Sequence, residues 1–122
     1  MRIPKALRPG STIRVVSPAS PIEEHKLAAM EKLLRDEGYA VQLARHALLS
    51  DYYLAGNDTA RAEDLMEAFL DPSVDAILCS RGGYGSARLL PLLDLDRMAA
   101  SGKLLLGYSD ITSLHLALLR RG

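Results

Sequence analysis

Short runs of apolar and β-branched residues alternate along this chain with longer stretches in which apolar residues recur at helical spacing. Strands that alternate with helices are typical of βαβ units around a parallel sheet. The runs that predict strands are residues 12–17, 39–44, 74–79 and 103–106, and the last is apolar enough to be a fully buried strand. We therefore expect a three-layer α/β domain with a mainly parallel sheet of about four strands.

The first helix has well-marked ends in the sequence. Ser20, Pro21 and Glu23 form the pattern of a capping box with proline at the first helical position, and Gly38 is a typical stop signal. We expect four side chains of this helix to share one buried face: Leu27, Met30, Leu33 and Leu34.

Further helices are expected in the second half of the chain. Asn57 or Asp58 can cap a helix that runs to about Leu70, before Asp71-Pro72. The remaining helical signals are a helix that ends near residue 93, a short helix or turn near 96–100, and a helix at 111–119 that is apolar on most sides. Residues 45–56 form a long irregular loop, and loops of that length are often functional.

Composition narrows the class of protein. Fifteen basic and fifteen acidic residues give a formal net charge of zero, so no cationic field would hold nucleic acid or anionic lipid. The apolar runs fall far short of the roughly 20 residues that span a membrane, and the first residues lack the apolar core of a signal peptide. The single Cys79 cannot form an internal disulfide and is expected to be a buried small hydrophobe. These features predict a cytoplasmic protein with one domain in residues 1–122.

Three strand-to-helix turns carry most of the candidate chemistry, at residues 17–20, 81–85 and 107–110. In an open parallel sheet the carboxyl ends of the strands meet at one edge, where such turns bring polar groups together. We therefore expect the functional site at that edge.

Ser109 lies in the third of these turns. A serine at a tight strand-to-helix turn can hold its hydroxyl clear of the backbone, while amides at the start of the next helix face developing negative charge. Gly107 gives the strand space to turn, but Ile111 stands where the G-x-S-x-G nucleophile elbow has its second glycine. On spacing alone, Ser109 and Asp110 could equally well cap the last helix.

Residues 81–85, Arg-Gly-Gly-Tyr-Gly, form the most glycine-dense segment of the chain. Backbone amides here could join the amide of Asp110 in an oxyanion hole, where one donor typically contributes about 3 to 4 kcal/mol to transition-state stabilisation. An unconstrained turn, or a module that holds a phosphate or carboxylate, would also explain the glycines. Dinucleotide binding is disfavoured, because Arg88 occupies the position where G-x-G-x-x-G/A requires a small residue.

In this combination and at this spacing, the motifs resemble the amino-terminal domain of the LD-carboxypeptidase family. The resemblance spans nearly the whole chain and rests on Leu-Arg-Pro-Gly at 7–10, Ser-Pro-Ala-Ser at 17–20, Arg61 with Asp64-Leu65, the glycine-rich segment at 81–85, and Gly-Tyr-Ser-Asp-Ile-Thr at 107–112. It implies a flavodoxin-like or class I glutamine-amidotransferase-like domain followed by a separate carboxyl-terminal domain. A Ser-His-Glu triad would be divided between the two domains, with no metal or cofactor.

The resemblance also implies roles for particular residues. Ser109 would be the nucleophile, Asp110 would supply one oxyanion amide, and Gly82 or Gly83 would supply the second. The family's usual substrate is a murein tetrapeptide, from which the terminal D-alanine is removed during cytoplasmic cell-wall recycling. A related branch confers immunity to a peptide-nucleotide antibiotic by cutting a different amide.

The resemblance further implies that the triad histidine and glutamate lie in the carboxyl-terminal domain, beyond residue 122. Residues 1–122 alone are then expected to lack triad-level hydrolysis and to expose apolar surface where the second domain packs. Family members are commonly homodimers, so a second copy of the chain is another candidate partner.

Arg81 and Tyr84 are candidate substrate-binding residues. Arg81 could clamp a substrate carboxylate or pair with Asp110, and the sequence leaves both roles open. Tyr52 and Tyr53 could cover a substrate or a dimer partner, or they could shield the edge of the core.

None of the three histidines is a clear base for Ser109. His115 is six residues along the following helix and should point away from the turn, while His25 and His46 have no obvious carboxylate partner. The rival hypotheses are a non-catalytic anion-binding module and an interaction domain that has lost its catalytic partner. A sparsely populated backbone conformation at Ser109 would favour the enzyme.

Overall fold

The four apolar runs form four parallel strands in the computed structural model, which describes residues 3–122. The strands are β1 (Thr12–Val16), β2 (Ala40–Leu43), β3 (Ala76–Cys79) and β4 (Leu104–Leu106). Their order in the sheet is β2-β1-β3-β4, which is that of the first four strands of a flavodoxin-like fold. The expected α/β architecture with a parallel sheet is confirmed.

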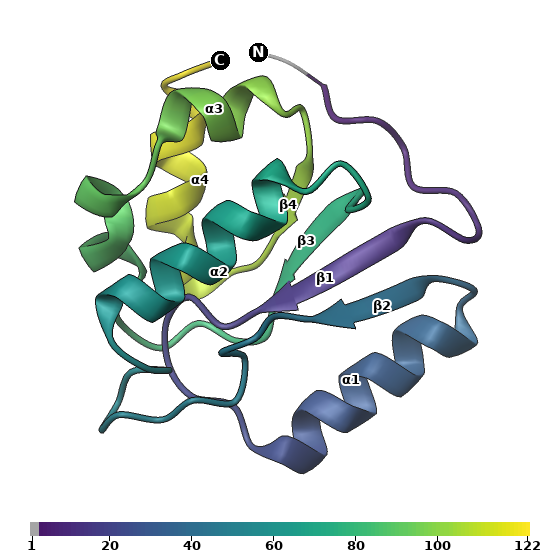
Figure 1. Cartoon of the computed structure of the whole chain (residues 1–122), viewed down its shortest axis with the longest axis horizontal. Helices are drawn as coiled ribbons and strands as arrows, with labels where there is room; N and C mark the ends of the chain where they lie inside the picture. Colours follow the sequence, from purple (N-terminus) through teal and green to yellow (C-terminus); the bar gives the residue numbers. More distant parts are fainter. Residues whose placement is uncertain (1–2) are drawn as a thin grey trace.

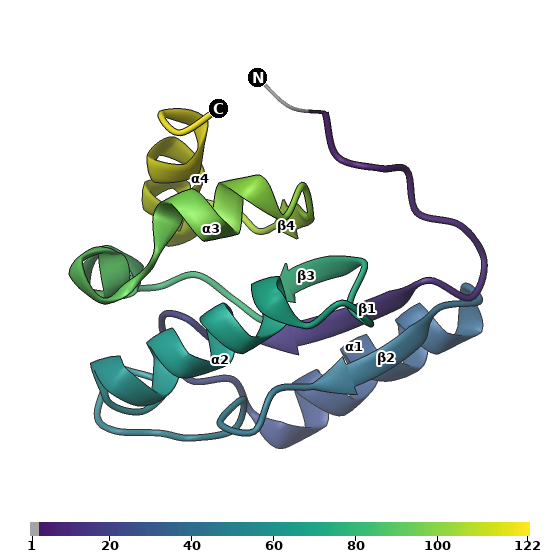
Figure 2. The ribbon, with the colours of Figure 1, turned by 45° about the horizontal axis from the view of Figure 1, so that its top comes forward.

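Helices cover both faces of this sheet (Figures 1 and 2). They are α1 (Glu24–Asp36), α2 (Asp58–Leu70), α3 (Leu95–Ala100), α4 (Thr112–Leu119) and the 3-10 helices η1 (Ser86–Leu92) and η2 (Ser109–Ile111). Successive side chains of a strand point to opposite faces, so Val15 packs with Leu27 of α1 while Val16 joins a core with Leu65 of α2 and Leu114 of α4. The sheet is thus the middle of three layers. No helix within residues 3–122 has the length and apolar character needed to cross a membrane.

The start of α1 differs from the sequence-based prediction. Its N-cap residue is Glu23, whose side chain makes no capping hydrogen bond, so the expected capping box is wrong. The hydroxyl of Ser20 instead accepts a hydrogen bond from the amide of Tyr84, a partner 64 residues away that local spacing cannot reveal. Leu27 is buried as expected, but Leu33 is 63% exposed and therefore lies on the solvent side of the helix.

Three segments in the second half of the chain also differ from expectation. Within residues 3–122, β4 is an outer strand that pairs only with β3, so its residues are partly exposed instead of fully buried. α4 buries Leu114 but exposes Leu116 and Leu119, so it is not buried on most sides. The helix expected after the glycine-rich segment is the 3-10 helix η1, which contains Pro91. Proline removes a backbone donor and disfavours a regular α-helix there.

α2 begins and ends as expected, and its end holds an acid with a perturbed pKa. Asn57 caps the helix by accepting a hydrogen bond from the amide of Ala60 at 2.8 Å. Beyond the last turn, Asp71 accepts hydrogen bonds from the Ser73 hydroxyl at 2.7 Å, the Ser73 amide at 2.8 Å and Arg14 Nη2 at 2.6 Å. The Ser73 hydrogen bonds, followed by Arg14, lower the pKa of Asp71 from 3.8 to about 2.

Asp71→Asn should therefore destabilise the protein in a pH-dependent way. A carboxyl with a lowered pKa in the folded chain stabilises it above the unfolded-state pKa, and that contribution is lost as the pH falls through the folded-state pKa. The difference in free energy of unfolding between wild type and Asp71→Asn should be constant above about pH 5 and shrink between about pH 4 and pH 2. Urea unfolding at stepped pH values measures it. Ser73→Ala, which keeps the Arg14 contact, should reduce this pH dependence only in part, and a pH-independent difference for Asp71→Asn would contradict the account.

Candidate active site

The three turns singled out in the sequence meet at one edge of the sheet, where β1, β3 and β4 end. The amide of Ser20 donates to the carbonyl of Gly82 at 3.2 Å, and the amide of Tyr84 donates to the Ser20 hydroxyl at 3.0 Å. Gly82 in turn lies against Ser109. The expected gathering of these turns at the carboxyl ends of the strands is confirmed.

Ser109 is exposed and adopts a strained backbone conformation. Its φ of 58° lies in the left-handed region, where Tyr52 is the only other non-glycine residue among those described. Such a conformation costs roughly 1–2 kcal/mol for a residue with a Cβ atom, and this kind of strain is typical of functional sites. Within the described chain, no side-chain hydrogen bond caps η2 or α4, so Ser109 and Asp110 do not cap the last helix. The turn instead presents the Ser109 side chain to solvent, as a nucleophile elbow does.

Gly107 makes this turn possible beside a bulky neighbour. A Cβ atom at this position would lie 2.7 Å from Ile111 Cγ2, well inside the roughly 3.5–4.0 Å separation of carbon atoms in contact. Ile111 itself is fully buried. An isoleucine at the position of the elbow's second glycine is compatible with this turn, because its side chain packs into the core.

The two central glycines of the glycine-rich segment face different neighbours. A Cβ atom on Gly82 would lie 3.1 Å from Ser109 Cβ and 3.2 Å from the amide nitrogen of Asp110. Gly83 has a φ of 99°, and a Cβ atom there would collide with the Ser20 hydroxyl. Gly82 is therefore the glycine that packs directly against the Ser109 turn.

Asp110 joins the Ser109 turn to the residue that follows the glycine-rich segment. Its carboxylate accepts a hydrogen bond from the amide of Ser86 at 2.9 Å. The hydroxyls of Ser86 and Ser113 both donate to the Asp110 carbonyl, at 2.6 and 2.8 Å. Ser86 is fully buried, and its role was not predicted because nothing in its sequence neighbourhood distinguishes it from an ordinary turn serine.

The two candidate substrate-binding residues lie exposed on the glycine-rich segment. Arg81 donates to the carbonyl of Pro21 at 3.0 Å. The Asp110 carboxylate accepts the Ser86 amide, and no ion pair joins it to Arg81 within residues 3–122. The ring of Tyr84 packs edge-on against that of Tyr53, with 5.3 Å between the ring centroids. The long loop therefore reaches the glycine-rich segment and places an aromatic surface beside it.

Arg61 is a site residue that the local sequence pattern did not distinguish. It is 1% exposed in the first turn of α2. Its guanidinium donates to the carbonyls of Pro18, Gly56 and Gly85 and pairs with the Asp58 carboxylate. Burial lowers the pKa of Arg61, and the charge of Asp58 opposes this effect. The only sequence signal was its place among the motifs that resemble the LD-carboxypeptidases.

His46 has a carboxylate partner that the sequence did not reveal. Its Nδ1 lies 2.9 Å from Asp64 Oδ1, and its amide donates to Asp64 Oδ2 at 2.8 Å, so the expectation that it lacks such a partner is wrong. The two residues are 18 positions apart and meet only because the loop packs onto α2. His46 follows β2 and Ser109 follows β4, at opposite sides of a sheet whose strands are about 4.8 Å apart. His46 is therefore too distant to act as the base for Ser109.

The other two histidines are also occupied elsewhere. His115 is half-buried and its Nε2 lies 3.1 Å from the carbonyl oxygen of Leu105, as expected for a packed histidine. His25 is exposed on α1, and its Nδ1 lies 3.5 Å from Glu23, a carboxylate contact that was likewise not expected. The described residues thus offer Ser109 no histidine base.

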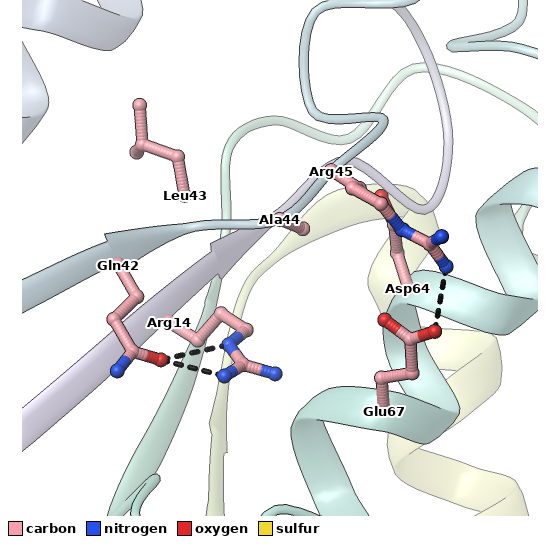
Figure 3. Close-up of a pocket in the computed structure, with 7 residues that line it drawn as sticks. All are labelled: Arg14, Gln42, Leu43, Ala44, Arg45, Asp64 and Glu67. Atoms are coloured by element: carbon pink, nitrogen blue, oxygen red, sulfur yellow. Dashed lines mark hydrogen bonds and ion pairs between the residues drawn. The ribbon is translucent and has the colours of Figure 1, made fainter.

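A cavity of about 390 Å³ opens between α2 and the ends of β1 and β2 (Figure 3). Charged side chains line it, but each already has a polar partner. Arg14 donates to Gln42 at 2.6 and 3.0 Å, and Arg45 pairs with Glu67 at 2.6 Å. Because it lies on the β2 side of the sheet, away from Ser109, this cavity does not belong to the candidate active site.

Cys79 is the buried small hydrophobe that the sequence predicted. It ends β3 within the hydrophobic core and is 4% exposed. Burial raises the pKa of its thiol to about 12. Since the thiolate is the reactive form of cysteine, Cys79 is not a candidate nucleophile.

Large apolar side chains are exposed near the Ser109 turn and along α4. Tyr108, next to Ser109, is 74% exposed, and Tyr84, Leu116 and Leu119 are also exposed. An apolar cavity of about 360 Å³ lies along β4 and α4. The exposed rings of Tyr84 and Tyr108 therefore lie near the carboxyl ends of the strands, whereas the cavity lies along α4 and the first residues of β4.

Comparison with known proteins assigns this chain to a family. The family model of the LD-carboxypeptidase N-terminal domain matches residues 13–122. A murein tetrapeptide carboxypeptidase of Pseudomonas aeruginosa is 42% identical over 111 residues, which cover 90% of this chain and 36% of that protein. The chain spans 36% to 40% of the length of the first curated relatives it matches.

Two solved structures are similar to this chain in both fold and sequence. An MccF-like protein from Bacillus anthracis superposes with a TM-score of 0.93 at 36% identity, over 99% of this chain and 38% of that one. A muramoyltetrapeptide carboxypeptidase from Oxalobacter formigenes gives a TM-score of 0.84 at 34% identity, over 92% of this chain and 38% of that one. Since the family model covers nearly all of its residues, this chain belongs to the LD-carboxypeptidase family and corresponds to its amino-terminal domain.

Proposed function

We propose that this chain supplies the nucleophile of a serine carboxypeptidase that removes a terminal D-amino acid from murein tetrapeptides. The observation that carries the proposal is Ser109, an exposed serine in a left-handed conformation, at a strand-to-helix turn that packs against Gly82. Family membership and the named carboxypeptidases among the relatives support the substrate class. In this proposal the protein acts in the cytoplasm, where murein peptides are recycled.

The proposed reaction is acyl transfer in two steps. A general base takes the proton of the Ser109 hydroxyl while its oxygen attacks the carbonyl carbon of the scissile amide. The tetrahedral intermediate then collapses, the C–N bond breaks, and the protonated base gives its proton to the leaving amino group. The same base next activates a water molecule, which hydrolyses the Ser109 ester and releases the shortened peptide.

Backbone amides stabilise the oxyanion in this proposal. The Asp110 amide lies in the first helical turn after Ser109, where helix-starting amides favour negative charge. Gly82 or Gly83 supplies the second donor, and the contact of Gly82 with the Ser109 turn favours Gly82. Arg81 and Tyr84 stand exposed beside these groups and are proposed to contact the peptide.

In this proposal the histidine and glutamate of the triad come from outside residues 1–122. No histidine within the described residues is placed near Ser109, and the relatives are more than twice as long as this chain. The additional domain would cover exposed apolar side chains such as Tyr108 and complete the pocket for the peptide. A second copy of the chain in a homodimer is the other candidate for that surface.

The full-length protein should release D-alanine from murein tetrapeptide, whereas residues 1–122 alone should do so at least about 10³-fold more slowly, because base and acid catalysis are missing. Chromatography of free D-alanine measures the rate, with a peptide that ends in L-alanine as the control substrate. Comparable hydrolysis by residues 1–122 would contradict the divided triad. A full-length protein that binds phosphate or carboxylate at the glycine-rich segment but releases no D-alanine would favour the anion-binding module instead.

A further inference from the structure

Arg61 joins three loops of the candidate site through one buried guanidinium. Its Nη1 donates to the carbonyls of Pro18 and Gly85, both at 2.9 Å, and its Nε donates to the carbonyl of Gly56 at 3.0 Å. Pro18 follows β1, Gly56 precedes α2, and Gly85 ends the glycine-rich segment. Asp58 accepts a hydrogen bond from Nη2 and supplies the opposite charge. A buried charge is tolerated only when it is paired and hydrogen-bonded, and Arg61 meets both conditions.

The arrangement depends on the shape of a guanidinium. Arginine presents its donors in a rigid planar fork, whereas lysine has a single nitrogen that cannot reach carbonyls on separate sides. The fit against Gly85 is close: its φ is 116°, and a Cβ atom there would lie 3.1 Å from Arg61 Nη1. Arg61 thus fixes the backbone of Gly85 relative to the loops after β1 and before α2.

This contact anchors one end of the segment that faces Ser109. At the other end, the Gly82 carbonyl accepts the amide of Ser20 at 3.2 Å. An oxyanion donor must be held within about 0.5 Å of its productive position to be effective. Loss of the Arg61 contact would leave the Gly85 carbonyl without this donor and would allow the segment to shift relative to Ser109.

We propose that Arg61 is a positioning residue that holds the oxyanion amides of the glycine-rich segment in place relative to Ser109. This inference rests on the function proposed above. Arg61 is 1% exposed, so it acts through Gly85 and not by touching the peptide. Oxyanion contacts form in the transition state, so a positioning role lowers kcat and leaves KM nearly unchanged. A purely structural role would change only the stability of the protein.

The test compares Arg61→Lys with Arg14→Lys in the full-length protein. Arg14 is the matched control, because its guanidinium also makes several hydrogen bonds, in this case to Gln42 and Asp71. It is partly buried and lies on the β2 side of the sheet, away from the glycine-rich segment. Arg61→Lys should lower kcat by about 10²-fold with little change in KM, the scale of losing one oxyanion donor. Hydrogen–deuterium exchange of the peptide that covers residues 81–86 should become at least about tenfold faster. Arg14→Lys should leave kcat and this exchange unchanged, whatever its effect on Tm.

The proposal is overturned if Arg61→Lys lowers Tm but keeps both the wild-type kcat of the folded protein and the wild-type exchange of residues 81–86. If Arg61→Lys does not fold, Asp58→Asn replaces it, since this change weakens the hold on the guanidinium without emptying its site. It should then give a smaller fall in kcat and faster exchange of the same peptide, and unchanged values would also overturn the proposal. If the wild-type full-length protein releases no D-alanine, the proposed function fails, while exchange still shows whether Arg61 orders the segment.

Discussion

Replacing Ser109 with alanine in the full-length protein should lower kcat/KM for tetrapeptide hydrolysis by at least about 10³-fold. Loss of a serine nucleophile has cost about 10⁶-fold in a well-studied serine protease, and the remaining rate comes from the oxyanion hole and substrate binding. Removing the hydroxyl should leave the fold intact, because the strained turn is held by the contacts of Asp110 with Ser86 and Ser113. Tm should therefore stay equal to or above that of the wild type.

Ser101→Ala is the matched control for this experiment. Ser101 follows α3 and donates its hydroxyl to the carbonyl of Met98, away from the strand ends. Its replacement should change stability slightly and leave kcat/KM unchanged. If Ser109→Ala retains the wild-type rate while its Tm is unchanged, Ser109 is not the nucleophile and the proposed function loses its main support.

Gly82→Ala should lower kcat by about 10²-fold or more, the effect of displacing one oxyanion donor. The added methyl group would lie 3.1 Å from Ser109 Cβ and 3.2 Å from the Asp110 amide nitrogen, tighter than ordinary carbon contacts. Either the glycine-rich segment or the Ser109 turn must move to accommodate it. Both movements spoil the geometry between nucleophile and oxyanion donors, so kcat should fall even though the protein folds.

Gly38→Ala provides the control for changing a glycine. Gly38 has a φ of 96° and open space around the position of a Cβ atom, so alanine there should cost about 1–2 kcal/mol of stability through backbone strain alone. It lies between α1 and the start of β2, away from the carboxyl ends of the strands, and kcat should not change. Steady-state kinetics and urea unfolding on both variants separate the two effects, and a wild-type kcat for Gly82→Ala would contradict the placement of the oxyanion hole.

Much of the fold followed from local patterns in the sequence. Alternation of apolar runs with helical spacing predicted four strands and a parallel sheet, and Asn57 and Gly38 marked helix ends because caps and stop signals act within a few residues. The position of the turn at Ser109 could also be predicted, since glycine spacing and strand ends are local signals. The left-handed φ of Ser109 is known only from the structure.

The features that the sequence missed depend on contacts between distant segments. Ser20 carries a correct capping pattern but bonds Tyr84 instead, and His46 finds Asp64 only through the fold. The exposure of β4 could not be read from its apolar composition, because composition does not reveal that a strand lies at the edge of a sheet. Arg61 was missed as an anchor for the same reason: its three carbonyl partners come from three different loops.

The identity of the nucleophile is tested most directly by covalent labelling of the full-length protein. A tetrapeptide analogue with a diphenyl phosphonate in place of the scissile amide carbonyl reacts with an activated serine and leaves a stable adduct. After digestion, mass spectrometry should locate one adduct on Ser109, and both Ser109→Ala and excess murein tetrapeptide should abolish it. Labelling of a different residue would contradict the assignment of Ser109. Wild-type hydrolysis of the tetrapeptide by the Ser109→Ala variant would contradict it as well.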